Sequence, residues 1–323
     1  MVHAIRIHET GGPEVLRWEE VEVGAPGPGE ALVRQTAVGL NFIDTYHRSG
    51  LYPLPLPAIP GSEAAGVVEA VGEGVADLAP GQRVAYAGPV GAYAQARLVA
   101  ADRLVPLPDG LDDRAAAAVL LKGMTAQYLL RRTHRVEQGD TVLIHAAAGG
   151  VGRIACPWAK ALGATVIGTV STDEKAALAR GSGCDHVIVT SRERISARVR
   201  ELTGGKGVRV VYDSVGKETW EESLDSLAPL GLMVSFGNAS GPVPPFSPLV
   251  LARKGSLFLT RPTLVAYTAT RADLLSTAAD LFAAIRAGVV PAEVSRTYPL
   301  REAAGAHADL EGRRTTGSSV LLP

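Results

Sequence analysis

Hydrophobic positions in the first hundred residues come in short runs that glycine and proline interrupt. Runs of this length, with polar residues between them, are typical of strands. The clearest runs lie at residues 4–7, 31–34, 66–71 and 83–86. Proline is dense at 24–29 and 52–60, where no helix or central strand can pass, so both stretches are predicted loops. We expect a β-rich, barrel-like catalytic domain over residues 1–121.

The pattern changes after residue 112, where apolar strands begin to alternate with helical periods. A long helical run covers residues 114–130, and six candidate buried strands follow it. They lie at 141–145, 165–170, 186–189, 208–212, 232–236 and 256–260. Six strands alternating with helices predict an α/β fold with a doubly wound parallel Rossmann sheet, here over residues 122–262.

The last sixty residues alternate between helix and strand once more. Helical periods cover 271–287 and 301–312, and a short apolar strand covers 319–322. By its length, we expect the segment 263–323 to return to the catalytic domain.

Composition and charge favour a small-molecule partner. The formal net charge of −1 and the 46% of hydrophobic residues argue against a nucleic-acid binder and against a disordered chain. No apolar run approaches the roughly 18 residues of a membrane span, and the first residues lack a signal-peptide core. We therefore expect a cytoplasmic protein without a membrane partner. The two cysteines, Cys156 and Cys184, are expected to stay thiols.

A glycine-rich turn directly follows the first parallel strand. It reads Ala147, Ala148, Gly149, Gly150, Val151 and Gly152 and leads into a helical stretch. The turn requires a small residue at 147, Gly149 admits the pyrophosphate, and Gly152 allows close packing of helix on strand. The helix N-terminus adds amide donors and partial positive charge. This motif predicts a dinucleotide site.

The residue after the second strand indicates which nicotinamide cofactor binds. NAD enzymes place a carboxylate there, whereas this chain has Ser171, with Lys175 one helical turn further on. A hydroxyl accepts a 2′-phosphate that a carboxylate would repel, and Lys175 would neutralise it. NADPH is the expected cofactor. The alternative is that Asp173 or Glu174 binds the ribose and Lys175 is solvated.

Several further motifs together resemble one enzyme superfamily. The run Gly61, Ser62, Glu63, Ala64, Ala65 and Gly66 looks like the signature of medium-chain dehydrogenases and reductases. With residues 41–46, 122–125 and 145–152, the resemblance narrows to the quinone oxidoreductases of the ζ-crystallin-like branch and extends over essentially the whole chain. It implies NADPH-dependent quinone reduction by a homodimer.

The metal ligands of the zinc-dependent members are missing. Ser62 stands where the alcohol dehydrogenases of the superfamily have a zinc-binding histidine, Asn41 stands where a cysteine is expected, and both cysteines lie in the nucleotide-binding half. A catalytic zinc needs about three such ligands. We expect no metal site. Quinones and enones spread the charge that a hydride brings, so hydrogen-bond donors are sufficient for their reduction.

On the substrate side the candidates are Asn41, Tyr46 and Tyr52. Asn41 is expected to donate to a substrate oxygen or to hold the nicotinamide ribose, and the two phenols suit a planar quinone. The resemblance implies that all three line the substrate site. The alternative is structural: Asn41 caps a short helix starting near Phe42, and the tyrosines anchor a loop. Glu63 and Asp44, carboxylates in apolar surroundings, are given structural roles.

The resemblance also implies a set of cofactor contacts, most of them at the carboxyl ends of strands. They are Asn41, Thr125, Ser214, Phe236, Gly237, Phe258, Thr260 and Ser318. This chain departs from its relatives after the third strand, where an Asn-Tyr pair that helps to bind the 2′-phosphate is replaced by Val189 and Thr190. Arg192 or Arg194 is a candidate substitute.

Other functions remain open at this point. The enzymatic alternative is reduction of an enone or alkenal double bond, which the sequence does not separate from quinone reduction. A non-enzymatic alternative is an RNA-binding or crystallin-like role. The arginines of residues 192–200 are interrupted by Glu193 and Glu201, which favours a solvated helix face over a nucleic-acid site. A homodimer is expected to pair through the strand 256–260, an otherwise exposed apolar edge.

Overall fold

The computed structural model describes all residues from 1 to 323, in two compact units. Unit 1 consists of residues 1–124, 268–282 and 292–323, so it contains both chain ends; unit 2 consists of residues 125–267 and 283–291. The domain boundaries expected at 121 and 262 stay a prediction. None of the helices combines the length and apolar character needed to cross a membrane.

Unit 2 is built on a six-stranded parallel sheet, whose strand order is β10-β9-β8-β11-β12-β13. Its strands are β8 (Thr141–Ile144), β9 (Thr165–Val170), β10 (His186–Val189), β11 (Val208–Asp213), β12 (Leu227–Ser235) and β13 (Phe258–Thr260). This order, which reverses direction between β8 and β11, is that of the doubly wound dinucleotide fold. The predicted fold class is therefore confirmed.

The strand ends differ from the prediction where local backbone geometry overrides the apolar pattern. β12 begins at Leu227, five residues before the predicted start at 232. Pro229 and Gly231, residue types that usually mark a turn, lie within this strand, and Leu230 between them has φ 59°. β13 begins only at Phe258. Ser256, expected to open it, has φ 55°, which is incompatible with a strand.

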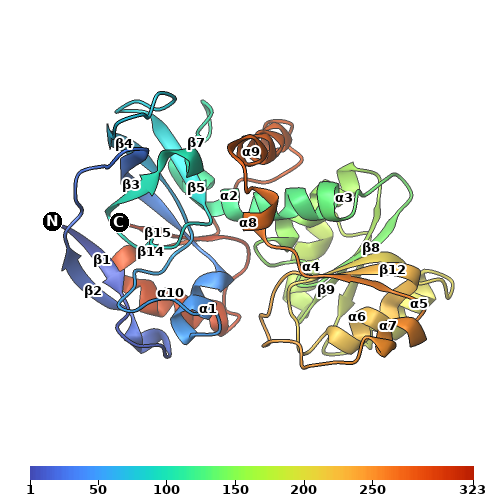
Figure 1. Cartoon of the computed structure of the whole chain (residues 1–323). Helices are drawn as coiled ribbons and strands as arrows, with labels where there is room; N and C mark the ends of the chain where they lie inside the picture. Colours follow the sequence, from blue (N-terminus) through green and yellow to red (C-terminus); the bar gives the residue numbers. More distant parts are fainter. The chain divides into compact units, whose positions relative to one another are not determined.

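Helices cover both faces of this sheet. They are α3 (Gly152–Ala161), α4 (Asp173–Gly181), α5 (Ile195–Leu202), α6 (Trp220–Ser226) and α7 (Leu249–Arg253). Unit 2 also contains the short helix α8 (Leu264–Tyr267) and a π-helical turn η3 (Leu129–Thr133). Figure 1 shows α6 and α7 together on one side of the sheet and α3 on the other. Buried side chains such as Leu143, Ile167 and Val211 fill the space under the helices.

Unit 1 contains two sheets. The smaller pairs β1 (Val2–Arg6) with β2 (Arg17–Val21); the larger follows the order β14-β15-β3-β4-β5-β7, with β6 paired to β3. Its strands are β3 (Glu30–Leu40), β4 (Glu63–Val71), β5 (Arg83–Ala87), β6 (Ala96–Ala100), β7 (Val105–Pro106), β14 (Arg296–Pro299) and β15 (Ser319–Leu322). No pairing of β14 with β7 closes a barrel, so the β-rich unit is an open sheet.

Short helices complete unit 1. They are α1 (Phe42–Ser49), α10 (Ala303–Glu311) and the 3-10 turns η1 (Pro13–Val15), η2 (Ala101–Arg103) and η4 (Leu300–Glu302). Two long helices, α2 (Asp113–Tyr128) and α9 (Arg271–Arg286), contribute residues to both units. α10 packs against α1 and η1, which brings the C-terminal segment to the helix that begins after Asn41.

Candidate functional site

The predicted dinucleotide turn joins β8 to α3 at the carboxyl edge of the sheet in unit 2. Ala147 is fully buried, and its amide donates to the carbonyl of Thr169 at 2.9 Å, which ties the turn to β9. A Cβ added to Gly152 would lie 2.6 Å from the carbonyl oxygen of Ala147, and one added to Gly149 would lie 3.1 Å from that of Ala146. Larger residues would push α3 away from the strand ends. Gly150 and Val151 complete the turn between these two positions.

A buried polar cluster holds the neighbouring strand ends in place. His145, after β8, pairs its Nδ1 with Thr169 and its Nε2 with Ser223, each at 2.9 Å. Asp213, at the end of β11, accepts from the backbone amides of Val215 and Gly216 and from the Ser223 hydroxyl. Burial lowers the pKa of His145, so the ring is neutral and serves as a crosslink. The cluster fixes the loop that carries Ser214.

The next candidates lie on the last two strands of the same sheet. The amide of Phe236 donates to Asp213, and a Cβ on Gly237 would lie 2.9 Å from the Cα of Ser214, so the loops after β11 and β12 touch. Thr260 ends β13 opposite Val234. Phe258 opens β13 two residues earlier, and its side chain is 60% exposed. Ser214, Phe236, Gly237 and Thr260 thus follow one sheet edge.

The loops after β9 and β10 lie side by side. Thr190 donates its amide to Val170 at 2.9 Å, next to Ser171. Thr172 caps α4, accepting from the amide of Lys175 at 3.3 Å. Arg192, from the loop after β10, forms an ion pair with Asp173, the first residue of α4. The N-terminus of α4 therefore carries the hydroxyl residues Ser171 and Thr172, with the Arg192 guanidinium paired to its first residue.

The other arginines of this region are engaged within the protein. Arg194 pairs with Glu222 at 2.8 Å, and Arg198 pairs with Glu201 and Glu193. Arg200 donates to three backbone carbonyls. Each of these guanidinium groups therefore already has an acceptor within the protein. This agrees with a solvated helix face over residues 194–200 rather than a nucleic-acid site.

Asn41, in unit 1, is the N-cap of α1, as the structural alternative proposed. It forms a capping box with Asp44, whose Oδ2 accepts from the Asn41 amide at 2.9 Å. The Asn41 side chain donates through Nδ2 to Glu63 Oε2 at 2.8 Å. Glu63 also accepts from the amide of Leu121 and lies 3.4 Å from Lys122 Nζ. Asn41 is thereby held between two buried carboxylates; its catalytic role stays a prediction.

Tyr46 and Tyr52 form an aromatic group at the end of α1. Their ring centroids are 5.2 Å apart in an edge-to-face arrangement, and Phe42 and His47 contact the same pair of rings. Burial lowers the pKa of His47, so this imidazole is neutral, and its Nδ1 is buried without a hydrogen-bond partner. The structure brings the two predicted tyrosines together, with their ring planes inclined at 66° to each other.

A second polar network, which our sequence reasoning missed, surrounds Asp44. Its Oδ1 accepts from Ser62 at 2.9 Å and its Oδ2 from the Tyr93 hydroxyl at 3.0 Å. The Tyr93 hydroxyl also contacts His307 Nε2 at 2.9 Å, and Arg48 lies 3.0 Å from His307 Nδ1. Burial raises the pKa of Asp44 from 3.8 to about 7, against the hydrogen bonds that lower it. His307 and Tyr93 are 214 positions apart, so no local signal could connect them.

The remaining predicted residues are dispersed. Thr125 lies in α2 and is buried, whereas Ser318 belongs to unit 1, just before β15. Both cysteines are buried thiols. No three His, Cys, Asp or Glu side chains come together in an arrangement able to hold a metal ion.

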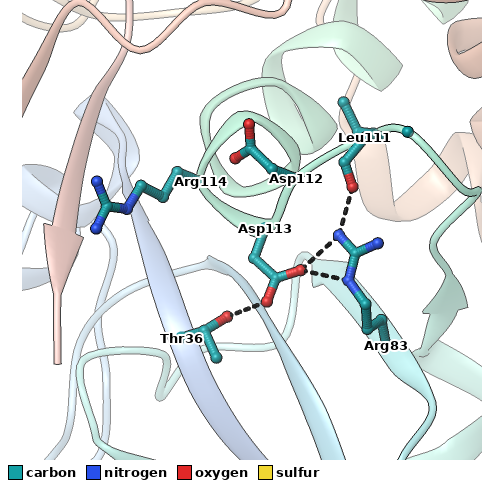
Figure 2. Close-up of a pocket in the computed structure, with 7 residues that line it drawn as sticks. Thr36, Arg83, Leu111, Asp112, Asp113 and Arg114 are labelled. Carbon is teal, nitrogen blue, oxygen red and sulfur yellow. Dashed lines mark hydrogen bonds and ion pairs between the residues drawn. The ribbon is translucent and has the colours of Figure 1, made fainter.

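A surface hollow of 790 Å³ lies at the start of α2, away from the predicted residues (Figure 2). Its polar side chains satisfy one another: Arg83 pairs with Asp113 at 2.7 Å, Asp113 accepts from Thr36 at 2.6 Å, and Asp112 caps the helix through the amide of Ala115. Figure 2 shows Arg83 and Thr36 converging on the one Asp113 carboxylate. This arrangement links α2 to β3 and β5.

Two protein families match parts of the chain. Residues 27–109 match the family described as alcohol dehydrogenase GroES-like domain, and residues 150–283 match that described as zinc-binding dehydrogenase.

Full-length relatives match more closely. A quinone oxidoreductase of Pseudomonas aeruginosa is 56% identical and a 2-haloacrylate reductase of Burkholderia is 53% identical; both alignments span all of this chain and at least 99% of the relative. The crystal structure of Escherichia coli quinone oxidoreductase complexed with NADPH superposes with a TM-score of 0.98 at 50% identity, covering 99% of this chain and 100% of that one.

Proposed function

The chain belongs to the quinone oxidoreductase family and is an oxidoreductase, and on that premise we propose that it uses NADPH to reduce quinones without zinc. The observation that carries the proposal is the turn at Ala147–Gly152, which presents the N-terminus of α3 at the carboxyl edge of a dinucleotide-type sheet. When bound, NADPH supplies a hydride equivalent.

The residues present fit a dinucleotide. Gly149 and Gly152 leave no side chain between the strand ends and the first turn of α3, so backbone amides can approach a pyrophosphate. The contact between Gly237 and Ser214 likewise keeps bulky atoms off the same sheet edge. We assign Ala147, Gly150, Val151, Phe236 and Thr260 to the same cradle, with Thr125, Phe258, Ser318 and Asn41 as the outer contacts implied by the family resemblance.

The surroundings of Ser171 favour NADPH over NADH. The alternative considered for NADH has Asp173 or Glu174 bind a ribose hydroxyl. Arg192 forms an ion pair with Asp173, which disfavours that carboxylate for the role. Arg192 is 65% exposed, so it remains accessible to a phosphate. We assign Ser171, Lys175 and Arg192 to the 2′-phosphate. Arg192 is chosen over Arg194 as the replacement for the tyrosine that relatives use, because it pairs with the first residue of α4, whereas Arg194 pairs with Glu222 of α6.

On the substrate side we assign the aromatic group of Tyr46 and Tyr52. Hydride addition to a conjugated carbonyl places negative charge on its oxygen, and a phenol hydroxyl can stabilise that charge as a hydrogen-bond donor. The two rings offer apolar contacts to a planar quinone, which can stack on the face of one ring and meet the edge of the other. Asn41, whose amide orientation Glu63 fixes, is the neighbouring polar group.

A second candidate function is reduction of an activated carbon–carbon double bond. The support is the 2-haloacrylate reductase relative, whose 53% identity to this chain lies between the 56% and the 50% of two quinone oxidoreductases. Both reactions add a hydride to an electron-poor conjugated system, so one set of donors serves both.

A substrate panel tests the proposal. NADPH or NADH oxidation is measured with a benzoquinone, an enone, a 2-haloacrylate and a simple aldehyde, and alcohol oxidation with NADP, each before and after treatment with a chelator. We expect quinone-dependent NADPH oxidation that the chelator leaves unchanged. Turnover confined to the haloacrylate or enone would favour the second function, and chelator-sensitive alcohol oxidation would overturn both.

A further inference from the structure

We propose that Asp44 holds the proton that the reduction consumes and releases it through the hydroxyl of Ser62. This inference rests on the proposed function, because reducing a conjugated carbonyl requires one proton for each hydride. Asp44 and Ser62 are respectively 0% and 1% exposed, and their side chains are joined at 2.9 Å. Asp44 acts through Ser62 and is therefore a positioning residue.

The hydrogen bonds around Asp44 suit both of its protonation states. As a carboxylate it accepts from Ser62, from the Tyr93 hydroxyl and from the backbone amide of Asn41, at 2.9–3.0 Å. As a neutral acid it can donate from Oδ1 to Ser62 Oγ, because a serine hydroxyl accepts as readily as it donates. The Ser62 proton is then free to point away from Asp44.

The far side of the network is closed to protons. Arginine can only donate, so Arg48 donates to His307 Nδ1, and His307 carries its proton on Nε2, facing Tyr93. Burial and then Arg48 lower the pKa of His307 to about 3, which keeps the imidazole neutral. Arg48 is paired at 2.8 Å with Glu311, the outermost group of this chain of contacts. Protons therefore leave and return by way of Ser62.

The charges near Asp44 leave its carboxyl without a direct ion pair. Lys122, the cation of α2, is bound to Glu63, and Arg48 is bound to Glu311. Asp44 instead contacts hydroxyls and an amide, so hydrogen bonds are the main stabilisation of its charge and the more distant Lys122 adds a smaller share. Such a carboxyl can take up and release a proton near neutral pH, the property that a general acid requires.

The step balances. A hydride and its electron pair pass from the reduced cofactor to the conjugated carbonyl compound, which leaves negative charge on the substrate oxygen. The Ser62 O–H bond breaks toward that oxygen as the Asp44 Oδ1–H bond breaks toward Ser62 Oγ. Ser62 ends unchanged, Asp44 ends as a carboxylate with three donors, and water returns the proton after the product leaves.

Substitution of both residues tests the relay. Asp44→Asn can keep the hydrogen bonds of the protonated form, because an amide oxygen accepts from Asn41 and Tyr93 and an amide nitrogen donates to Ser62, but it cannot release a proton. We expect Asp44→Asn and Ser62→Ala each to lower kcat for a quinone about 100-fold at pH 7, the scale of general acid catalysis. Ser62→Thr, which keeps the hydroxyl, should recover most of the rate.

The pH profile separates a proton relay from a structural role. Wild-type kcat should fall as pH rises through about 7, as Asp44 ionises, and Asp44→Asn should lack this titration. Tyr93→Phe removes a donor to the carboxylate and should move the titration to higher pH. Thr45→Ala, which removes another buried hydroxyl from α1, should keep the wild-type profile.

An infrared difference spectrum between pH 6 and pH 8 reports on Asp44 without turnover. A carboxylic-acid band that disappears in Asp44→Asn is expected. The relay alone would be overturned if the wild type is active and both Asp44→Asn and Ser62→Ala keep its kcat within about twofold and its pH profile. A wild type that oxidises NADPH with no acceptor in the panel would overturn the proposed function, and the relay with it.

Discussion

At the scale of single residues, the two units use buried polar groups differently. In unit 2, the buried imidazole of His145 forms hydrogen bonds with the hydroxyls of Thr169 and Ser223 and so links β8 to β9 and α6. In unit 1, Asp44 is buried with donors but no cation, so its ionisation costs free energy. That cost makes Asp44 sensitive to pH, whereas His145 remains a fixed neutral crosslink.

The stability of the protein should report the burial of Asp44. Its folded pKa of about 7 lies above the unfolded value of 3.8, so its favourable contribution is complete below about pH 4 and is lost as pH rises through 7. The loss is at most about 4 kcal/mol, from roughly 1.4 kcal/mol for each pKa unit. Asp44→Asn, which removes this ionisation, should gain stability relative to wild type between pH 5 and pH 8. Urea unfolding of both proteins at pH 5 and pH 8 checks this. A difference in unfolding free energy between Asp44→Asn and wild type that is the same at both pH values would contradict the assignment.

Cofactor choice is expected to depend on the single position 171. Ser171→Asp should weaken NADPH binding at least tenfold and favour NADH, because a carboxylate repels a 2′-phosphate and binds a ribose hydroxyl. Titration calorimetry with both cofactors measures the effect. Ser247→Asp, an equal change of charge at an exposed site of unit 2, should leave the ratio of affinities unchanged. An unaltered ratio in Ser171→Asp would remove Ser171 from the 2′-phosphate site.

The phenol hydroxyls of Tyr46 and Tyr52 should affect turnover more than folding. We expect Tyr46→Phe or Tyr52→Phe to lower kcat/KM for a quinone about tenfold, through loss of a donor to the developing oxyanion. Tyr298→Phe, which removes a hydroxyl bound to Asp309 elsewhere in unit 1, is the control. If both variants stay within about twofold of wild type, neither hydroxyl stabilises the transition state.

At the scale of elements, the start of α3 is a closely packed part of the candidate cofactor site. Its first residue, Gly152, has backbone oxygens of the preceding turn where a side chain would project. Ala146, within that turn, adopts φ 51°, a conformation that L-residues rarely take. The element is therefore set by close approach of backbone atoms, and helix propensity contributes little.

Gly152→Ala should separate α3 from β8. The added Cβ would lie 2.6 Å from the carbonyl oxygen of Ala147, so the backbone must move, at a cost of about 1–3 kcal/mol in unfolding free energy. NADPH affinity should fall at least tenfold. Gly181→Ala, at the last residue of α4 with no atom within 4 Å of its Cβ, should be neutral or slightly stabilising. Thermal unfolding and cofactor titration compare the pair, and equal behaviour of the two variants would contradict the packing argument.

At the scale of the whole molecule, the β13 edge of the unit 2 sheet has no neighbouring strand within the chain. β13 is the last strand of the six and its Phe258 side chain is 60% exposed. Exposed apolar edge strands tend to pair with another chain. Pairing with a second copy about a two-fold axis, as the family resemblance implies, would cover this edge.

We therefore predict a dimer that a charge on β13 disrupts. Wild type should scatter light as a dimer at micromolar concentration, and Phe258→Glu should shift it toward monomer. Leu178→Glu, a similar exposed position on α4, should have no such effect. A monomeric wild type would exclude the dimer, and a dimeric Phe258→Glu would place the interface elsewhere.

The sequence by itself determined the features that depend on neighbours along the chain. The strand–turn–helix order around Gly149, the alternation of apolar strands with helices, and the serine at position 171 are all local patterns, and the fold they predicted is confirmed. The structure decided what depends on contacts between distant segments. It made Asn41 a helix cap, left the β-rich sheet open, and joined Asp44, Tyr93 and His307. Periodicity reports which face of an element is buried, but it carries no information on which distant polar groups meet there.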